Sequence, residues 1–415
     1  MMTLTLVLAF AAFRSGEPWL DTDGNVIDAH GGGFLQVGDT YYWYGSQRNG
    51  WGWYTRVGAR GRRTLECCHD GGINVYSSKD LYSWAYEGKV LKAFNGSATG
   101  NGLDLERPKV VRCPSTQQYV MWVRGTGDGN TPQLLGVAVS PSPTGPFAFV
   151  GNASDPFHTV FPGNINEPEG YQYADATLFV DPKTSRAFVY WRTRVNPQNT
   201  GFRAMELTDD CLGVREETDT QLFQSPNREA PAVFFAYEQY YLWTSGCNGW
   251  APTTMHLYTA DHPLGSMNAS GLNNSQGWLI GWQPNPIPDP GQPGNQQPEQ
   301  PGVWAFGSQS TYILPNPLYV EGSPLAPFVY MADRWTPDGN ASFGTYVWLP
   351  LFIDPANHSR VRVVWHDSWR LDNATSPFVR ARRRHSLTRA TINKSWLLEQ
   401  ERRLIVEGDL SEFVV

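Results

Sequence analysis

Residues 29–45 read AHGGGFLQVGDTYYWYG: a polar residue heads an apolar run, and a turn then leads into an aromatic strand. The same order recurs four times. We call the first segment of each repeat, with its polar residue, the opening; the four other openings are LERPKVV (Glu106), YADATLFV (Asp175), REAPAVFF (Glu229) and SQSTYIL (Gln309). Each opening is followed by an aromatic-rich run, and these runs are TYYWYG, QYVMWVR, AFVYWR, QYYLWTS and PFVYMADRW. Each interval has room for four short strands, which is one propeller blade. The repeat therefore predicts an all-β, five-bladed β-propeller over residues 17–372.

The composition supports this fold class. The chain has 415 residues and is rich in aromatic residues (17 Trp, 19 Tyr, 20 Phe), glycine (41) and proline (31), which favours short strands and tight turns. Helical periodicity occurs only near 394–405, in the predicted C-terminal tail, 373–415. The Pro/Gln/Asn-rich segment 265–303 interrupts the repeat and predicts a long surface loop.

Two features of the sequence indicate a secreted glycoprotein. Residues 1–16 begin with MMTLTLVLAFAAF, which is similar to the hydrophobic part of a signal peptide but lacks its basic start; a truncated gene model is the alternative. Asn-x-Ser/Thr sequons occur at eight positions: Asn95, Asn152, Asn268, Asn273, Asn340, Asn357, Asn373 and Asn393. Chance would give about three. With no second apolar segment, we expect an extracellular protein without a membrane anchor.

Charge and cysteine content limit the partners and cofactors. The net charge of −7 argues against nucleic-acid binding, which usually needs a basic face. The five cysteines have no zinc-site spacing, and one or two structural disulfides are the expected use. We expect a monomer that needs neither a metal nor a cofactor.

The HGGG run at residues 30–33 also occurs in the oxyanion holes of lipases and esterases. Such an enzyme needs a G-x-S-x-G nucleophile elbow, and the sequence has none. It also has no H-E-x-x-H pair for a zinc hydrolase. We therefore interpret the glycines as places where the backbone of an inner strand runs close to the channel or to a sugar.

The remaining polar openings suggest glycoside hydrolysis. In a propeller, Glu106, Asp175, Glu229 and Gln309 would meet at one end of the central channel. Glycosidases need one carboxylic acid that protonates the leaving oxygen and a second group that handles water. Aromatic loop residues, namely Trp51, Trp53, Trp250 and Trp335, would offer faces for sugar rings. For any single carboxylate, a salt bridge to a neighbouring arginine is the alternative interpretation.

Together, REAPAVFF…YYLWTSGCNGW, ERPKVV…YVMW, YADATLFV, SPTGPF and SQSTYIL resemble glycoside hydrolase family 43, and more closely its exo-β-1,3-galactanase subgroup. The resemblance covers about residues 17–372 and implies a five-bladed propeller. It implies that Glu229 is the general acid and that Asp175 tunes its pKa. The family's usual base, an aspartate in blade one, is replaced here by His30, and the subgroup shares that loss.

The same resemblance implies the remaining roles in the site. Glu106 holds the substrate, and Gln309 lies where water is activated; Glu106 as a conventional base is the competing assignment. Asn248 and Trp250 contact the sugar, although the family more often has Thr at the Asn248 position. We also expect His30 and Trp335 to bind substrate.

The leading hypothesis is an inverting, exo-acting hydrolase that cleaves the β-1,3-galactan backbone of arabinogalactan and releases galactose or galactose bearing side chains. Two alternatives stay open. A family 43 arabinofuranosidase or xylosidase would need the missing blade-one aspartate. A non-catalytic sugar-binding propeller would explain the missing base but has no need for a general acid and its tuning carboxylate.

Overall fold

The computed structural model describes residues 11–48, 54–57, 63–66, 71–92, 104–126, 134–150, 172–194, 200–224, 228–247, 253, 255–265, 278–279, 306–335 and 344–378. Its strands form five antiparallel sheets of four strands each. The only helical element among the described residues is a 3₁₀ turn, Glu216–Thr218. The predicted helix near 394–405 lies outside the described residues.

Each sheet is built from strands in chain order. Blade one contains β2 (His30–Val37), β3 (Thr40–Ser46), β6 (Ile73–Ser78) and β7 (Ala85–Leu91). Blade two contains β8 (Asp104–Arg112), β9 (Tyr119–Thr126), β10 (Leu134–Ser140) and β11 (Ala148–Phe149). Blade three contains β12 (Gln172–Val180), β13 (Ala187–Arg194), β14 (Thr200–Glu206) and β15 (Thr220–Gln224). Blade four contains β16 (Arg228–Ala236), β17 (Gln239–Gly246), β18 (His256–Ala260) and β19 (Trp278–Leu279), and blade five contains β20 (Gln309–Pro315), β21 (Phe328–Arg334), β22 (Thr345–Asp354) and β23 (Asn357–Val363).

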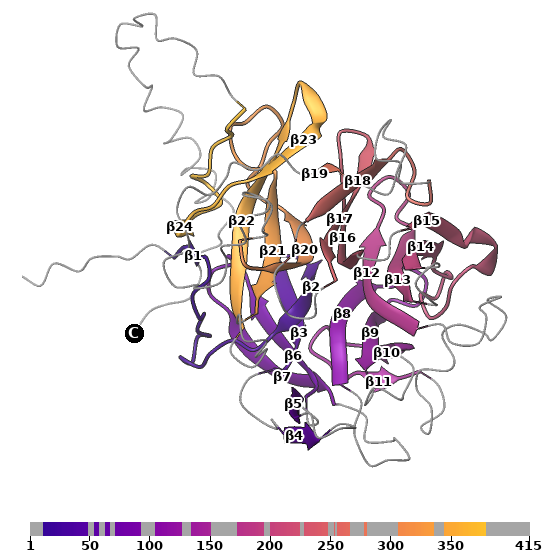
Figure 1. Ribbon diagram of the computed structural model, residues 1–415. Helices are drawn as coiled ribbons and strands as arrows, with labels where there is room; N and C mark the ends of the chain where they lie inside the picture. The colour runs from indigo at the N-terminus through magenta and orange to yellow at the C-terminus, as the bar shows by residue number, and fades with distance from the viewer. Residues whose placement is uncertain are drawn as a thin grey trace, which may run out of the picture. The chain divides into compact units, whose positions relative to one another are not determined.

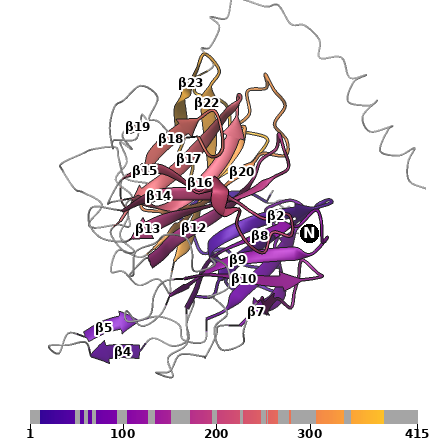
Figure 2. The ribbon, with the colours of Figure 1, turned by 90° about the vertical axis from the view of Figure 1, so that its right-hand side faces the viewer.

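The first strand of every blade lies at the centre of the molecule. Strand β2 contacts β8, β8 contacts β12, β12 contacts β16, β16 contacts β20, and β20 contacts β2 again, which closes the ring (Figure 1). In the view turned by 90°, β2, β8, β12, β16 and β20 again lie toward the middle, with the outer strands around them (Figure 2). The predicted five-bladed propeller is therefore confirmed, and its five openings are the first residues of the inner strands.

The aromatic second strands form the core between blades. Trp122 of blade two and Trp191 of blade three belong to one hydrophobic cluster, and Trp243 of blade four and Tyr330 of blade five belong to another. A strand between two covered faces has both sets of side chains buried, so its sequence is a continuous apolar run rather than an alternating one. That explains why QYYLWTSG of β17 is buried almost throughout.

A two-stranded sheet of β1 (Phe13–Arg14) and β24 (Ser368–Trp369), which we call the clasp, joins the N-terminal and C-terminal ends of the propeller. Strand β1 pairs with β24, and Phe13 is 1% exposed. The backbone N–H groups of Ser15 and Gly16 donate to the carbonyl oxygens of Asp367 and Tyr346. Residues 13–16 thus form backbone hydrogen bonds with the propeller. The boundary predicted between a signal-like segment (1–16) and the propeller (17–372) stays a prediction.

The structure differs from the sequence analysis in one blade. Trp278–Leu279 lies inside the segment predicted as a long loop, yet it pairs with β18 as the outer strand of blade four. Its two residues are too few to give a periodic signal in a Pro/Gln-rich context. A further small sheet, β4 (Tyr54–Val57) with β5 (Arg63–Glu66), is inserted in blade one between β3 and β6.

The cysteines that the structure describes are not paired. Cys113, Cys211 and Cys247 carry free thiols, and Cys67 and Cys68 lie outside the described residues. The Cys113 thiol donates instead to the carbonyl oxygen of Asp209 at 3.1 Å. The expected one or two disulfides are therefore not found among the described cysteines.

Candidate active site

Every inner strand carries an irregularity next to its polar opening. The register of pairing shifts between His30 and Gly33, Glu106 and Lys109, Tyr173 and Ala176, Glu229 and Ala232, and Ser310 and Tyr312. A β-bulge bends the strand and redirects the side chains beside it. Five bulges at one end of the channel therefore bring five openings, distant in sequence, around one pocket.

The glycines of HGGG allow blades one and two to approach each other. A Cβ atom on Gly33 would lie 2.7 Å from the carbonyl oxygen of Pro108, and one on Gly32 would lie 2.5 Å from Trp43 Nε1. Gly31 has a φ of 63°, a conformation that suits glycine. Gly32 and Gly33 thus permit close packing against Trp43 and blade two, whereas Gly31 lines the pocket, as predicted for a glycine close to the channel.

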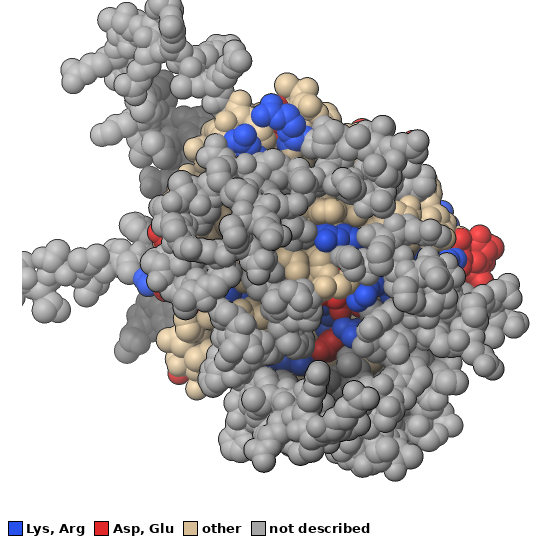
Figure 3. Space-filling view, viewed as in Figure 1, with Lys and Arg blue, Asp and Glu red and all other residues tan. Residues whose placement is uncertain are grey.

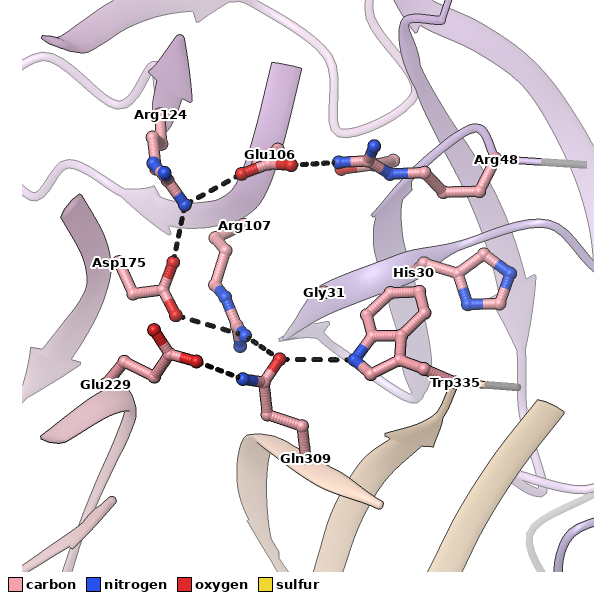
Figure 4. Close-up of a pocket in the computed structure, with 11 residues that line it drawn as sticks. His30, Gly31, Arg48, Glu106, Arg107, Arg124, Asp175, Glu229, Gln309 and Trp335 are labelled. Atoms are coloured by element: carbon pink, nitrogen blue, oxygen red, sulfur yellow. Dashed lines mark hydrogen bonds and ion pairs between the residues drawn. The ribbon is translucent and has the colours of Figure 1, made fainter. Parts of the chain in front are cut away.

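The openings surround a cavity of about 240 Å³. Its lining residues are His30, Gly31, Ser46, Arg48, Glu106, Arg107, Arg124, Asp175, Glu229, Gln309 and Trp335. Acidic and basic side chains lie close together near the middle of the face shown in Figure 3. The close-up shows them linked by hydrogen bonds and ion pairs across the pocket (Figure 4).

Glu229 has the properties of a general acid. Its Oε1 accepts a hydrogen bond from Gln309 Nε2 at 3.0 Å, and its Oε2 lies 3.3 Å from Arg192 Nη1. Burial and the nearby Asp175 carboxylate raise the pKa of Glu229 to about 7, against the opposing effect of the arginines. A carboxyl group with this pKa keeps its proton near neutral pH and can deliver it to a leaving oxygen.

Asp175 is held as an anion next to Glu229, the candidate general acid. It forms ion pairs with Arg124 at 2.7 Å and Arg107 at 3.2 Å, and it accepts the backbone N–H of Ala230 at 3.0 Å. Burial opposes its ionisation, but these partners outweigh burial and keep the pKa of Asp175 low. The charge of Asp175 is therefore available to raise the pKa of Glu229.

Glu106 is also ionised and has an arginine on each carboxylate oxygen. Arg48 donates to Oε1 at 2.5 Å, and Arg124 lies 2.8 Å from Oε2. Burial favours the neutral acid, but Arg124 and Arg48 hold the pKa of Glu106 below its usual value. A carboxylate with a lowered pKa is a weak base, which disfavours Glu106 as the group that takes a proton from water.

The Gln309 amide is tied to four neighbours. Its Oε1 accepts from Arg107 Nη2 at 2.5 Å and from Trp335 Nε1 at 3.2 Å, while its Nε2 donates to Glu229 and, at 3.4 Å, to Ser245 Oγ. Both lone pairs of the carbonyl oxygen are therefore used in this arrangement. Trp335, only 4% exposed, lines the pocket and orients this amide.

His30 occupies its predicted place, but its side chain is completely buried. Its Nδ1 lies 3.3 Å from Asp333 Oδ1, and its ring stacks on Tyr346 with centroids 5.1 Å apart. In Figure 4 the ring lies away from Glu229 and Gln309. His30 nevertheless lines the pocket, and its role in substrate binding stays a prediction. The backbone of Gly31 lines the pocket as well, held by Asp333 at its N–H and by Lys109 at its carbonyl oxygen.

Two other predicted substrate contacts, Asn248 and Trp250, lie outside the described residues, as do the loop residues Trp51 and Trp53. Of the predicted sites, the structure therefore brings together His30, Glu106, Asp175, Glu229, Gln309 and Trp335 around one pocket.

The sequence analysis missed a set of residues on the second strands. In four places a second-strand side chain reaches the opening of the next blade: Arg124 contacts Asp175, Arg192 contacts Glu229, Ser245 contacts Gln309, and Asp333 contacts His30. Each is the polar residue near the end of an aromatic run such as YVMWVR or FVYMAD. The sequence signal that could have revealed these residues is a polar residue that recurs near the end of the aromatic second strands.

The described residues contain no candidate metal cluster and no candidate membrane-spanning helix. No group of three His, Cys, Asp or Glu side chains there is placed to hold a metal ion. None of the helical structure in the same part of the chain is long and apolar enough to cross a membrane.

Known proteins share this architecture. The family described as "Glycosyl hydrolases family 43" matches residues 32–306. A family 43 β-1,3-galactosidase, solved with galactodeoxynojirimycin, is 31% identical, with a TM-score of 0.64 over 86% of this chain and 100% of that one. An exo-β-1,3-galactanase from Clostridium thermocellum is 28% identical, with a TM-score of 0.64 over 88% of this chain and 68% of that one.

The fold is also shared with an exo-β-1,3-galactanase from Phanerochaete chrysosporium. That protein is 24% identical, with a TM-score of 0.60 over 86% of this chain and 68% of the other. No curated protein sequence matches. Because the family match covers more than half of the chain and agrees with the propeller and with the carboxylates in its pocket, the protein belongs to glycosyl hydrolase family 43 and is a glycoside hydrolase.

Proposed function

We propose that the protein is an inverting, exo-acting β-1,3-galactanase that removes galactose, or galactose bearing side chains, from the galactan backbone of arabinogalactan. The observation that carries the proposal is the Glu229–Asp175 pair: a carboxyl group with a pKa near 7 beside a carboxylate held ionised by arginines. A glycosidase needs one carboxyl group that stays protonated, and a neighbouring carboxylate that stays ionised raises the pKa of that acid.

The cavity volume supports action at a chain end. About 240 Å³ lies below the range of about 300–1,000 Å³ for drug-sized ligands, so the pocket suits one sugar ring rather than a longer stretch of chain. The activities of the similar structures, β-1,3-galactosidase and exo-β-1,3-galactanase, support the choice of linkage.

In the proposed reaction, Glu229 gives its proton to the glycosidic oxygen while water attacks the anomeric carbon from the opposite face. Inverting enzymes keep the acid and the water-handling group about 6.5–9.5 Å apart. Gln309 Nε2 is only 3.0 Å from Glu229 Oε1, so Gln309 can orient the water only if its amide leaves Glu229 when the sugar binds. Glu106 is the other group that can orient the water, with the weak basicity that its arginines impose.

The two sequons that the structure describes fit the proposed secretion. Asn357 and Asn373 are both exposed, where a glycan can be attached without disturbing the core. We propose an extracellular, monomeric glycoprotein that acts on polysaccharide.

The test is to incubate the purified protein with β-1,3-galactotriose, arabinan and xylan oligosaccharides beside the Glu229→Gln variant. We expect galactose from the galactan substrate, first appearing as the anomer opposite to the cleaved linkage in proton NMR, and loss of this release in the variant. Release of arabinose or xylose instead would overturn the assigned substrate. Binding of galactotriose without release would overturn the proposed reaction.

A further inference from the structure

Arg192 lies on β13 opposite the bulge that contains Asp175, where pairing with β12 skips from Tyr173 to Ala176. From there it reaches the next blade and places Nη1 3.3 Å from Glu229 Oε2. Its side chain is 11% exposed, and Glu229 is the only carboxylate within ion-pair distance among the described residues. A buried guanidinium is thus directed at the general acid.

The carboxylate with which it pairs distinguishes Arg192 from the three arginines that line the pocket. Arg107 and Arg124 contact Asp175, and Arg48 and Arg124 contact Glu106; both carboxylates have lowered pKa values and stay ionised. Glu229 instead changes its charge during catalysis. Among the arginines that the structure describes, only Arg192 forms an ion pair with Glu229, the group that becomes negative when the glycosidic bond breaks.

We infer that Arg192 is the positioning residue of the general acid: it holds the Glu229 carboxyl group and stabilises the carboxylate left after proton transfer. In that step the O–H bond of Glu229 breaks and an O–H bond forms on the leaving sugar. The glycosidic C–O bond breaks, and its electron pair stays on the leaving oxygen. The attacking water forms the new C–O bond at the anomeric carbon and releases its proton to Glu106 or to solvent. The negative charge remains on Glu229, beside the guanidinium. The inference rests on the proposed function, because it requires Glu229 to act as the acid.

The charged and titratable groups around Glu229 determine whether its pKa rises or falls when Arg192 is removed. The charged or titratable side chains that face it are Asp175 on β12, Arg107 on β8, Arg124 on β9, Arg228 on β16, Arg192 on β13 and Cys247 after β17. Burial and Asp175 raise the pKa of Glu229, and the arginines Arg192, Arg107 and Arg124 lower it. A nearby opposite charge typically moves a carboxyl pKa by about 1–3 units, so loss of Arg192 raises it by about one unit or more.

The experiment compares Arg192→Met and Arg192→Gln, which remove the charge, with Arg192→Lys, which retains it. A matched control is Arg203→Met on the neighbouring strand β14, where Arg203 pairs with Asp219 away from the pocket. Two quantities are measured for each protein: kcat/KM for β-1,3-galactotriose against pH, and the Glu229 pKa by NMR of carboxyl-¹³C glutamate without substrate. The spectrum of Glu229→Gln assigns the signal, and circular dichroism checks folding.

We expect the alkaline limb of kcat/KM and the NMR titration of Glu229 to move upward by about one pH unit in both charge-removing variants. The lysine variant and the Arg203 control should stay close to the unmodified protein. An unchanged titration in a folded charge-removing variant would overturn the inference even if galactanase activity is present. If the unmodified protein releases no galactose, the proposed function fails, and the NMR titration alone decides whether Arg192 controls Glu229.

Discussion

Gln309 donates its amide hydrogen to Glu229 at 3.0 Å, so the candidate water-handling group and the proposed general acid are one hydrogen-bonded unit in this structure. Arg107 and Trp335 hold the other end of the same amide. The four groups come from three blades. A sugar that enters between Gln309 and Glu229 must break their contact, and the acid then loses a hydrogen-bond donor that stabilises its charged form.

Replacement of Gln309 or Glu106 by alanine distinguishes the two assignments for the water. If Gln309 orients the water, Gln309→Ala lowers kcat by about 10²-fold or more with little change in KM, because water handling belongs to the transition state. Glu106→Ala should then mainly raise KM. The reverse pattern, with kcat lost only in Glu106→Ala while binding of galactotriose by calorimetry is retained, would rule out Gln309.

The unmodified protein should lose kcat/KM as the pH rises through about 7, because Glu229 must be protonated and its pKa is about 7. The pH dependence of galactose release from β-1,3-galactotriose checks this. An alkaline limb that begins above pH 9 would identify a different acid.

Asp175→Asn should move that alkaline limb downward. The negative charge of Asp175 raises the pKa of Glu229, and its removal also leaves Arg107 and Arg124 without this partner. Both effects favour the ionised form of Glu229, so we expect a shift of about one pH unit or more toward acid. Asp219→Asn in the same blade, where the carboxylate pairs with Arg203, is the matched control and should leave the limb in place.

Trp335→Phe retains an aromatic ring but removes the N–H that donates to Gln309 Oε1 at 3.2 Å. A single hydrogen bond contributes about 1 kcal/mol, so we expect kcat/KM to fall by about fivefold. Steady-state kinetics on galactotriose provide the measurement. No change in rate would mean that Arg107 alone suffices to orient the amide.

Phe13→Ala tests the clasp formed by β1 and β24. Phe13 is buried among Trp348, Trp369 and Tyr82, with ring centroids 4.7–5.5 Å away. Removing such a side chain typically costs about 3–5 kcal/mol of unfolding free energy. Thermal and urea unfolding of the full chain should show the loss. Arg14→Ala, an exposed neighbour in the same strand, should have little effect.

The number of blades and the identity of the polar openings were predictable because they depend on local patterns. Each blade repeats one order of polar residue, apolar inner strand and aromatic second strand, and each inner strand of a closed ring faces the same channel. The short strand Trp278–Leu279 was missed because its pairing partner β18, and not its own two residues, makes it a strand.

The chemistry of the pocket depends on contacts between blades that no local pattern contains. The sequence places Glu229 beside Arg228, but the arginine that pairs with it in the structure is Arg192 from the preceding blade. Glu106, Asp175 and Glu229 lie in similar sequence segments. Arginines nevertheless keep Glu106 and Asp175 ionised, whereas burial and the like charge of Asp175 raise the pKa of Glu229. Local sequence therefore determines which strands form and where each side chain enters the channel. The tertiary structure decides which carboxyl group is the acid, because desolvation and charge pairing act through space.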